Sequence, residues 1–296
     1  KERILKMANT IALAKNYTSI LDEVYCNASV TADLTSDNTM VRAGANANEI
    51  IYPQISVSGL GDYSRNSGYT NGSVNLEWKT AKFNYDRGTK ISVDVMDNEE
   101  SRDIAFTMAG AELMRTKVAP EADAFVFATL AGTAGISKAT PATYADATEF
   151  LNALIVAKNK MDEDEVPEEG RILYATPTLM NGVMALDTTK SREILNSFTV
   201  KKKVPQSRFY TAIDLLDGKS PGEEAGHYKK ADAGKEINFM IVHKPAVIKF
   251  DKHTASDIIP ASANANADAD ISKYRKYGIV DVFQNKVAGI YLSHKA

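Results

Sequence analysis

Residues 74–95 read VNLEWKTAKFNYDRGTKISVDV, and this stretch decides the predicted fold. Two groups of apolar residues in it alternate with polar ones: Val74, Leu76 and Trp78, then Ile91, Val93 and Val95. Because successive side chains of a strand point to opposite faces, each group predicts a strand with one apolar face. Together the two groups predict a half-buried antiparallel ladder.

Between these groups the apolar positions change parity. Phe83 and Tyr85 have odd numbers, whereas the apolar residues from Val74 to Trp78 have even ones. A β-bulge within residues 80–82 would bring all of them to a single face. The tetrapeptide Asp-Arg-Gly-Thr at residues 86–89 then predicts a turn that reverses the chain.

An extended β arm is therefore predicted. Ile51, Ile55 and Val57 supply a further strand, and residues 59–72, rich in Gly, Asn, Ser and Tyr, form a mobile tip. At about 3.3 Å per residue, an arm of about 15 residues reaches roughly 50 Å and has no second layer of its own. Its apolar face must be covered by the rest of the chain or by a neighbouring copy. The candidate subunit-contact residues are Val74, Leu76, Trp78, Phe83, Tyr85, Ile91 and Val93.

A long helix is predicted directly after the arm, over residues 98–131. Asp97 and Glu100 have the spacing of a capping box at its start. At about 1.5 Å per residue this helix spans roughly 50 Å, longer than most globular helices. Pro120 lies inside it and cannot donate a hydrogen bond to the carbonyl of Thr116, so a kink or an interruption is expected there.

The segments on either side of the arm and helix are less regular. Residues 10–25 predict an amphipathic N-terminal helix, and residues 29–48 predict an extended connector. Residues 132–144, rich in Gly, Ala, Thr and Pro, predict a linker and the best candidate domain boundary.

A compact α/β unit is predicted after this linker. Asp146 and Glu149 have capping-box spacing before a helix, and an apolar strand spans residues 172–175. Thr176 and Pro177 then begin a second helix, which ends near Leu186.

The last third of the chain predicts one long loop followed by strands. Residues 201–234 predict a surface loop with one helical fragment around residues 212–216. Strands are predicted at residues 237–242 and 246–250, and residues 274–283 and 287–292 predict a final pair joined at Gln284-Asn285.

Composition excludes several classes of protein. The net charge of −3 and the pI near 5.9 argue against a domain that reads nucleic-acid sequence, since such a domain normally carries a basic face. Cys26 is the single cysteine, so an intrachain disulfide is excluded and packing in a helix is the favoured role. No apolar run reaches the ~18 residues of a membrane span, so no membrane contact is expected.

No catalytic or ligand-binding motif in the sequence is complete. Gly59-Leu60-Gly61 begins like a phosphate-binding loop, but Ser64 stands where the fingerprint continues and no helix follows. Residues 264–270 alternate Asn and Asp as calcium ligands do, yet Arg275 occupies the place of the closing glutamate, so a polar, capped loop is favoured.

The remaining charged clusters favour the same conclusion. Lys201 to Lys203 could contact phosphate or an acidic segment such as residues 162–165, but a solvated loop is favoured. The four histidines, His227, His243, His253 and His294, lack metal-ligand spacing. We therefore predict no catalytic, cofactor-binding or metal-binding residues and no cofactor.

The order of the predicted elements resembles the major capsid protein of tailed double-stranded-DNA bacteriophages, whose fold is shared with encapsulin nanocompartments. The resemblance rests on residues 55–65 (ISVSGLGDYSR), 96–100 (MDNEE), 103–106 (DIAF), 114–118 (MRTKV) and 285–291 (NKVAGIY). It implies an α+β fold that covers nearly the whole chain.

The resemblance also implies a domain organisation. The implied parts are an N-terminal arm and connector (1–48), an extended β loop (49–97), a peripheral domain with a spine helix (98–144), an α/β axial domain (145–247), peripheral return strands (248–284) and a final axial strand (285–296). In such proteins the extended loop lies across the adjacent subunit.

The implied function is structural and not enzymatic. Many copies would assemble through hexamers and pentamers, in the cytoplasm of a bacterial host, into the icosahedral head of the virion. The implied partners are a scaffolding protein, a portal and packaged double-stranded DNA held without base-specific contacts. Two alternatives stay open: an encapsulin-type shell around a cargo enzyme, and an enzyme whose site is assembled from dispersed carboxylates.

Overall fold

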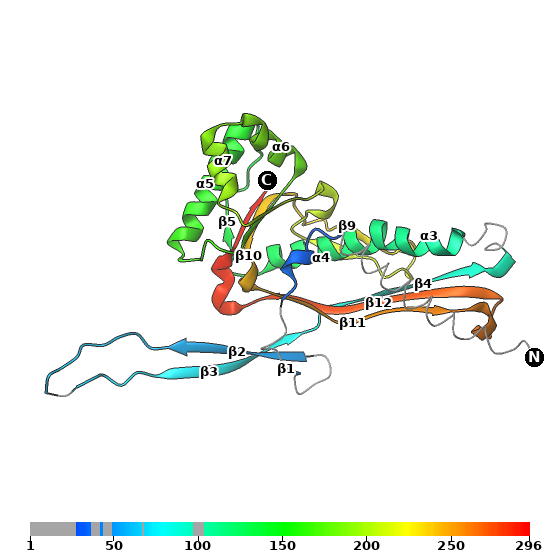
Figure 1. The fold of residues 1–296 in the computed structure, drawn as a ribbon, viewed down its shortest axis with the longest axis horizontal. Helices are drawn as coiled ribbons and strands as arrows, with labels where there is room; N and C mark the ends of the chain where they lie inside the picture. Colours follow the sequence, from blue (N-terminus) through cyan, green and yellow to red (C-terminus); the bar gives the residue numbers. More distant parts are fainter. Residues whose placement is uncertain (1–27, 37–41, 44–48, 67, 97–103) are drawn as a thin grey trace, which may run out of the picture.

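The computed structural model describes residues 28–36, 42–43, 49–66, 68–96 and 104–296 (Figure 1). Two larger bodies and a projecting hairpin are built from four sheets, and one long helix runs between the two bodies. The predicted helix at residues 10–25 and the Asp97–Glu100 capping box lie outside the described residues.

The arm is a hairpin of β2 (Glu49–Val57) and β3 (Val74–Lys82), with the short β1 (Arg42–Ala43) beside β2. Figure 1 shows it projecting from the body, away from the rest of the sheets. Its antiparallel register runs without a break from Val57 opposite Val74 to Glu49 opposite Lys82. The predicted bulge within residues 80–82 is therefore wrong, and the apolar side of β3 changes face.

The lower of the two bodies in Figure 1 contains a three-stranded sheet in the order β11-β12-β4. Its strands are β11 (Val247–Ile259), β12 (Ala269–Val282) and β4 (Tyr85–Asp94). The turn predicted at residues 86–89 is wrong, because β4 passes straight through it and pairs with β12. A Cβ on Gly88 would lie 2.8 Å from the carbonyl oxygen of Tyr274. This glycine therefore permits close approach of two strands and does not form a turn.

The long helix is continuous, from α3 (Ile104–Leu113) through the π-helical segment η3 (Met114–Val118) to α4 (Ala119–Gly132). Pro120 does not interrupt it. The wider turn of η3 instead precedes the proline, as π-turns do where the regular hydrogen-bond ladder is disturbed. In α4 ten of the 14 residues are buried, which is typical of a helix that is covered on most sides.

The upper body is built on a five-stranded sheet in the order β5-β13-β10-β6-β7. Its strands are β5 (Ser137–Lys138), β6 (Arg171–Ala175), β7 (Val200–Lys203), β10 (Ile237–His243) and β13 (Ile290–His294). One face packs on the helices α5 (Ala147–Glu163), α6 (Pro177–Leu186) and α7 (Thr189–Asn196). The predicted strand at 172–175 and the predicted ends of α6 are confirmed, and the side chain of Asp146 caps α5.

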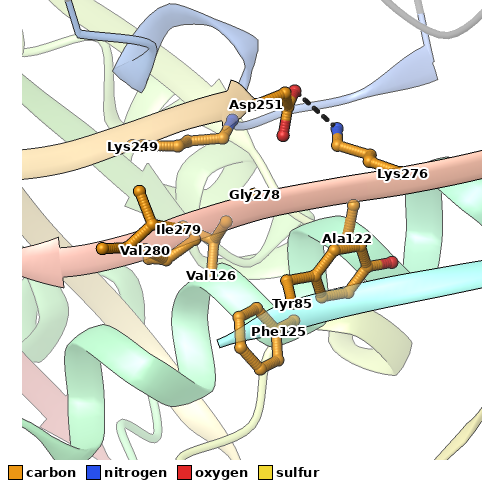
Figure 2. Close-up of a pocket in the computed structure, with 10 residues that line it drawn as sticks. All are labelled: Tyr85, Ala122, Phe125, Val126, Lys249, Asp251, Lys276, Gly278, Ile279 and Val280. Atoms are coloured by element: carbon orange, nitrogen blue, oxygen red, sulfur yellow. Dashed lines mark ion pairs between the residues drawn. The ribbon is translucent and has the colours of Figure 1, made fainter. Parts of the chain in front are cut away.

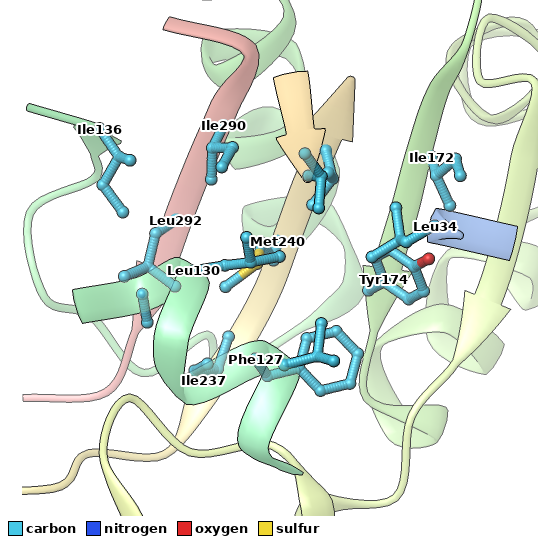
Figure 3. Close-up of a cluster of buried hydrophobic side chains, with 14 of the residues drawn as sticks. Leu34, Phe127, Leu130, Ile136, Ile172, Tyr174, Ile237, Met240, Ile290 and Leu292 are labelled. Carbon is cyan, nitrogen blue, oxygen red and sulfur yellow. The ribbon is translucent and has the colours of Figure 1, made fainter. Parts of the chain in front are cut away.

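The other face of this sheet packs on α4, as Figure 3 shows. Phe127 and Leu130 of α4 meet Met240 of β10, Tyr174 of β6 and Leu292 of β13 in one buried cluster. The same cluster takes in Val280 and Val282 of β12, so α4 is the layer between the two sheets.

The predicted pairing of the last two strands is wrong. β12 and β13 lie in different sheets and are separated by η7 (Gln284–Gly289). β13 pairs with β10 and β5, because Ile290 and Leu292 fill the cluster over α4. The helical fragment expected at residues 212–216 is also wrong, since β8 (Ile213–Leu215) pairs there with β9 (Tyr228–Lys230).

Besides η7, the described residues contain four short 3₁₀-helices. They are η1 (Ala32–Leu34), η4 (Gln206–Arg208), η5 (Lys244–Ala246) and η6 (Ala261–Ala263). Lys201 to Lys203 form the edge strand β7, where lysines discourage unwanted strand pairing. Lys202 pairs with Asp33 at 2.8 Å.

Candidate subunit interface

The distal half of the arm carries an apolar stripe on one face. Residues directly opposite each other in an antiparallel ladder share a face. Three apolar pairs stand in succession along β2 and β3: Val57 with Val74, Ile55 with Leu76, and Pro53 with Trp78. Five of these residues are largely exposed, from 44% for Trp78 to 71% for Val74, and Pro53 is half-buried. We call Pro53, Ile55, Val57, Val74, Leu76 and Trp78 the arm stripe.

The base of the arm is anchored through its opposite face. Ile50, Tyr52 and Ala81 are buried against Ile248, Phe250 and Ile279 of the three-stranded sheet. The ring of Tyr52 also meets that of Phe283 edge-on at 5.0 Å. One face therefore holds the hairpin on its own chain, while the arm stripe points from the other.

The junction between β3 and β4 fixes the root of the arm. The side-chain amide of Asn84 donates through Nδ2 to the backbone carbonyl of Val280 at 2.7 Å. Its Oδ1 accepts from the backbone N–H of Val280 at 3.0 Å. Phe83 stacks on Tyr277 with ring centroids 4.7 Å apart. These contacts continue the sheet through a side chain, so the arm leaves the body in a defined direction.

The candidate residues fall into three groups. Val74, Leu76 and Trp78 lie together on the arm stripe, and the structure adds their partners Pro53, Ile55 and Val57. Phe83 and Tyr85 do not belong to this surface: Phe83 packs on Tyr277, and Tyr85 is 5% exposed beside Phe125. Ile91 and Val93 are half-buried on β4, opposite Ser272 and Asp270 of β12.

The signal for the missed partners was present in the sequence. Ile55 and Val57 alternate with Gln54 and Ser56, which predicts a strand with the same kind of apolar face as β3. This alternation does not predict the register of the two strands, which places Ile55 opposite Leu76.

At the tip of the arm further apolar side chains are exposed. The rings of Tyr63 and Tyr69 lie 4.9 Å apart, and Leu60 is fully exposed. The amide of Ser58 donates to the carbonyl of Ser73 at 2.9 Å and extends the ladder by one step. Exposed apolar side chains thus also occur beyond the regular strands.

A buried ion pair joins β4 to the long helix near the root of the arm. Arg87 donates to Glu121 through Nε at 2.6 Å and through Nη2 at 3.3 Å, and Nδ1 of His227 lies 3.6 Å from the same carboxylate. Burial alone would raise the pKa of Glu121, but the neighbouring His227 and Arg87 leave that pKa below its usual value.

A small cavity under α4 is lined by Tyr85, Phe125, Val126, Lys249, Asp251 and Lys276, among others (Figure 2). Asp251 is the one carboxylate among the lining residues, and it pairs with Lys276 at 3.1 Å. The paired carboxylates of an enzyme with a dispersed acidic site are not brought together here.

The histidines and the Asn- and Asp-rich residues 264–270 are the other candidate ligand residues. No group of three or more His, Cys, Asp and Glu within the described ranges could hold a metal ion. Around η6, Asp270 accepts from the amide of Ala261 at 2.8 Å, and Asn264 accepts from that of Asn266 at 3.1 Å. Among the described helices, none is long and apolar enough to cross a membrane.

No known family and no curated protein matches the sequence, but solved structures share its fold. A chain of Mycobacterium phage Che8 aligns with a TM-score of 0.58 and 13% identity, over 90% of each chain. The mature capsid of bacteriophage PhiM1 aligns with a TM-score of 0.57 and 14% identity, over 84% of this chain and 82% of that one.

A third similar structure is the virus-like particle from Pyrococcus furiosus. It aligns with a TM-score of 0.58 and 9% identity, over 95% of this chain and 99% of that one. The chain therefore has the α+β fold of tailed-phage capsid proteins, which confirms the predicted fold class.

Proposed function

We propose that this chain is the structural subunit of an icosahedral shell, and that the arm stripe is a contact between neighbouring copies. The carrying observation is the arm stripe itself, because five of its six apolar residues stay exposed on a hairpin whose other face is anchored to its own chain. Exposed apolar patches of this kind mark interaction sites. The capsid fold supports self-association as the reason.

In this proposal the parts of the chain have separate duties. Residues 49–97 lie over the adjacent subunit, residues 98–144 and 248–284 form the peripheral domain, and residues 145–247 with 285–296 form the axial domain around each capsomer centre. The subunit has no enzymatic role. Ile91 and Val93 remain proposed contacts of lesser exposure.

Charge placed on the stripe tests this proposal against a matched position on the other face. Leu76→Lys should abolish shells and capsomers in electron micrographs and light scattering, while Asn75→Lys, one residue away on the opposite face, should still assemble. Both side chains are exposed, so both variants should fold. A wild-type chain that stays monomeric at every concentration would overturn the shell proposal, and assembly of Leu76→Lys would remove the stripe from it.

The favoured shell is a phage head, built in the cytoplasm of a bacterial host with a scaffolding protein and a portal and filled with double-stranded DNA. The virus-like particle from P. furiosus keeps the second candidate open, a compartment around a cargo protein, because the alignment covers nearly all of both chains. Purified particles decide between them: nuclease-protected DNA and one portal vertex support a head, whereas a packaged protein without DNA supports a compartment.

A further inference from the structure

Residues 28–36 cross the joint where α4, the three-stranded sheet and the five-stranded sheet meet. Leu34 of η1 is fully buried in the cluster that also holds Phe127 of α4, Tyr174 of β6 and Val247 of β11. Nine residues therefore touch all three parts of the fold. Figure 3 shows Leu34 entering this cluster beside Tyr174.

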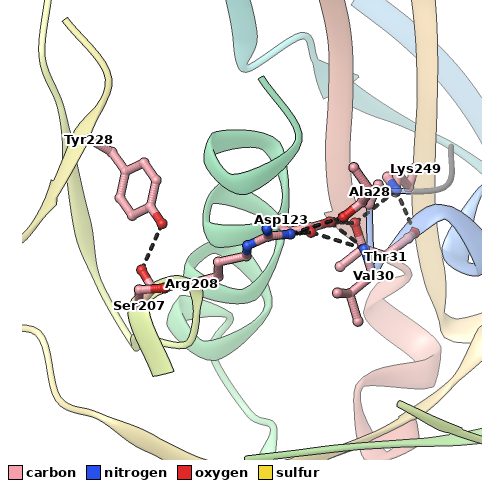
Figure 4. Close-up of polar contacts among 9 residues, drawn as sticks. Ala28, Val30, Thr31, Asp123, Ser207, Arg208, Tyr228 and Lys249 are labelled. Carbon is pink, nitrogen blue, oxygen red and sulfur yellow. Dashed lines mark hydrogen bonds and ion pairs between the residues drawn. The ribbon is translucent and has the colours of Figure 1, made fainter. Parts of the chain in front are cut away.

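The carboxylate of Asp123 on α4 is the centre of these contacts (Figure 4). It is fully buried and accepts from the hydroxyls of Ser29 and Thr31, each at 2.8 Å. It also accepts from the backbone amides of Val30 at 2.9 Å and Thr31 at 3.1 Å. A buried carboxylate is stable only with such donors, and four of these come from this one segment.

Arg208 of η4 adds the fifth donor and belongs to the upper body. Its Nη1 donates to Asp123 at 3.1 Å and to the carbonyl of Ala28 at 3.0 Å. The ion pair of Asp33 with Lys202 ties the same segment to β7. The segment is thus fastened to the five-stranded sheet on one side.

On the other side the segment is fastened to β11. Nζ of Lys249 donates to the carbonyl of Thr31 at 2.5 Å and to its hydroxyl at 3.1 Å. Ser36 donates through its amide to the carbonyl of Lys249 at 2.8 Å and through its hydroxyl to that of Val247 at 2.8 Å. These hydrogen bonds join the segment to the three-stranded sheet.

We propose that residues 28–36 act as a clasp that closes around Asp123 and locks the two sheets and α4 into one orientation. The polar contacts of the segment with both bodies converge on the same nine residues. With the clasp open, the relative orientation of the two bodies is held by fewer contacts and varies more. The device goes beyond shell formation and is a property of the single chain.

Distance measurements between the two bodies test the clasp directly. Spin labels are placed on Val156→Cys of α5 and Lys273→Cys of β12, both exposed positions, in a Cys26→Ser background. The parent should give one narrow distance distribution, and Asp123→Asn should broaden or shift it. Asp187→Asn, which breaks an exposed ion pair with Arg192, should leave it unchanged. An unchanged distribution in folded Asp123→Asn would overturn the proposal.

Hydrogen exchange separates the clasp from a general loss of stability. Asp123→Asn should speed exchange about tenfold or more in residues 28–36, η4 and the start of β11 together, and leave α5 to α7 protected. Uniform loss across the chain would contradict a clasp. If Asp123→Asn does not fold, Thr31→Val removes the hydroxyl bonds to Asp123 and Lys249 while keeping the side-chain volume, and the same two readouts apply.

Both readouts are made on assembly-blocked Leu76→Lys chains, so they do not depend on shells. A failed clasp and a failed shell proposal are thereby distinguishable.

Discussion

Glu121 shows how one buried residue holds the root of the arm to the long helix. Its ion pair with Arg87 is largely shielded from solvent, whereas Glu112 pairs with Arg115 on the surface of the same helix. Glu121→Gln should lower the free energy of unfolding by about 1–3 kcal/mol, since a buried charge-assisted bond is lost. The matched Glu112→Gln should cost under about 1 kcal/mol. Urea unfolding of both variants measures the difference, and equal losses would contradict the assignment.

The same carboxylate predicts a pH dependence. Because the pKa of Glu121 is lowered from its usual 4.5 in the folded chain, its contribution to stability is present above pH 4.5. That contribution is lost as the pH falls through the folded-state pKa. The stability difference between wild type and Glu121→Gln should therefore shrink in acid. A difference that stays constant down to pH 3 would rule this out.

Lys249 predicts a second rise of stability with pH, in alkaline solution. Burial lowers the pKa of Lys249 from 10.5 to about 8. Between these two values the unfolded chain binds more protons than the folded chain, so stability from this residue rises with pH. Between pH 8 and pH 10 the free energy of unfolding of wild type should therefore rise relative to that of Lys249→Met, by about 1.4 kcal/mol per pH unit at most. Unfolding curves at three pH values measure the gain, and parallel curves would contradict it.

At the scale of elements, Gly88 carries the pairing of β4 with β12. Gly88→Ala would place a methyl group 2.8 Å from the carbonyl oxygen of Tyr274, and it should cost about 1–3 kcal/mol by forcing the strands apart. Gly59→Ala in the tip is the control, since nothing lies within 4 Å of the added carbon. Thermal unfolding compares the two, and a neutral Gly88→Ala would show that the ladder adjusts freely.

Elements were easier to predict from the sequence than their partners. Alternation of Val74 to Trp78 and of Ile91 to Val95 predicted two strands correctly, because it reports which side chains share a face. It contains no information on register, so the strand containing Ile91 was assigned to the arm although it pairs with β12. Gly88 led to the prediction of a turn for the same reason. A close approach between strands that are distant in the chain cannot be read from the residues next to the glycine.

The parity change between Trp78 and Phe83 does not come from a bulge. A bulge was expected because a strand usually keeps one apolar face. The structure instead uses both faces, one for the base at Ala81 and one for the stripe at Leu76. This assumption put Phe83 and Tyr85 on the face of the stripe, whereas they pack on Tyr277 and beside Phe125 of their own chain. Val74, Leu76 and Trp78 do share one face, and their contact with a neighbouring copy stays a prediction.

At the scale of the whole molecule, Trp78 separates folding from assembly. Trp78 is 44% exposed in the single chain, so Trp78→Ala should change the melting temperature of the isolated subunit only slightly. It should raise the concentration needed for shells at least tenfold, because aromatic anchors dominate interface energies. Light scattering and calorimetry on the same samples measure both quantities. An equal loss of melting temperature in subunit and shell would contradict the proposal that Trp78 contacts a neighbouring copy.

The fold itself does not decide what a shell contains. Phage chains and a virus-like particle share it with this chain at 14% identity or less, and a fold supports more than one function. The buried centre of this fold could not be predicted from the sequence either, because the donors to Asp123 lie more than 80 residues away from it.

The unbroken register of the arm restricts how its length can change. One residue added to β3 between Trp78 and Ala81, and one to β2 between Ile50 and Pro53, would turn the distal half over and move its apolar side chains to the opposite face. Two residues added to each strand would restore the side and lengthen the reach by about 6.6 Å. Related or engineered chains with longer arms should therefore differ from this one in even steps.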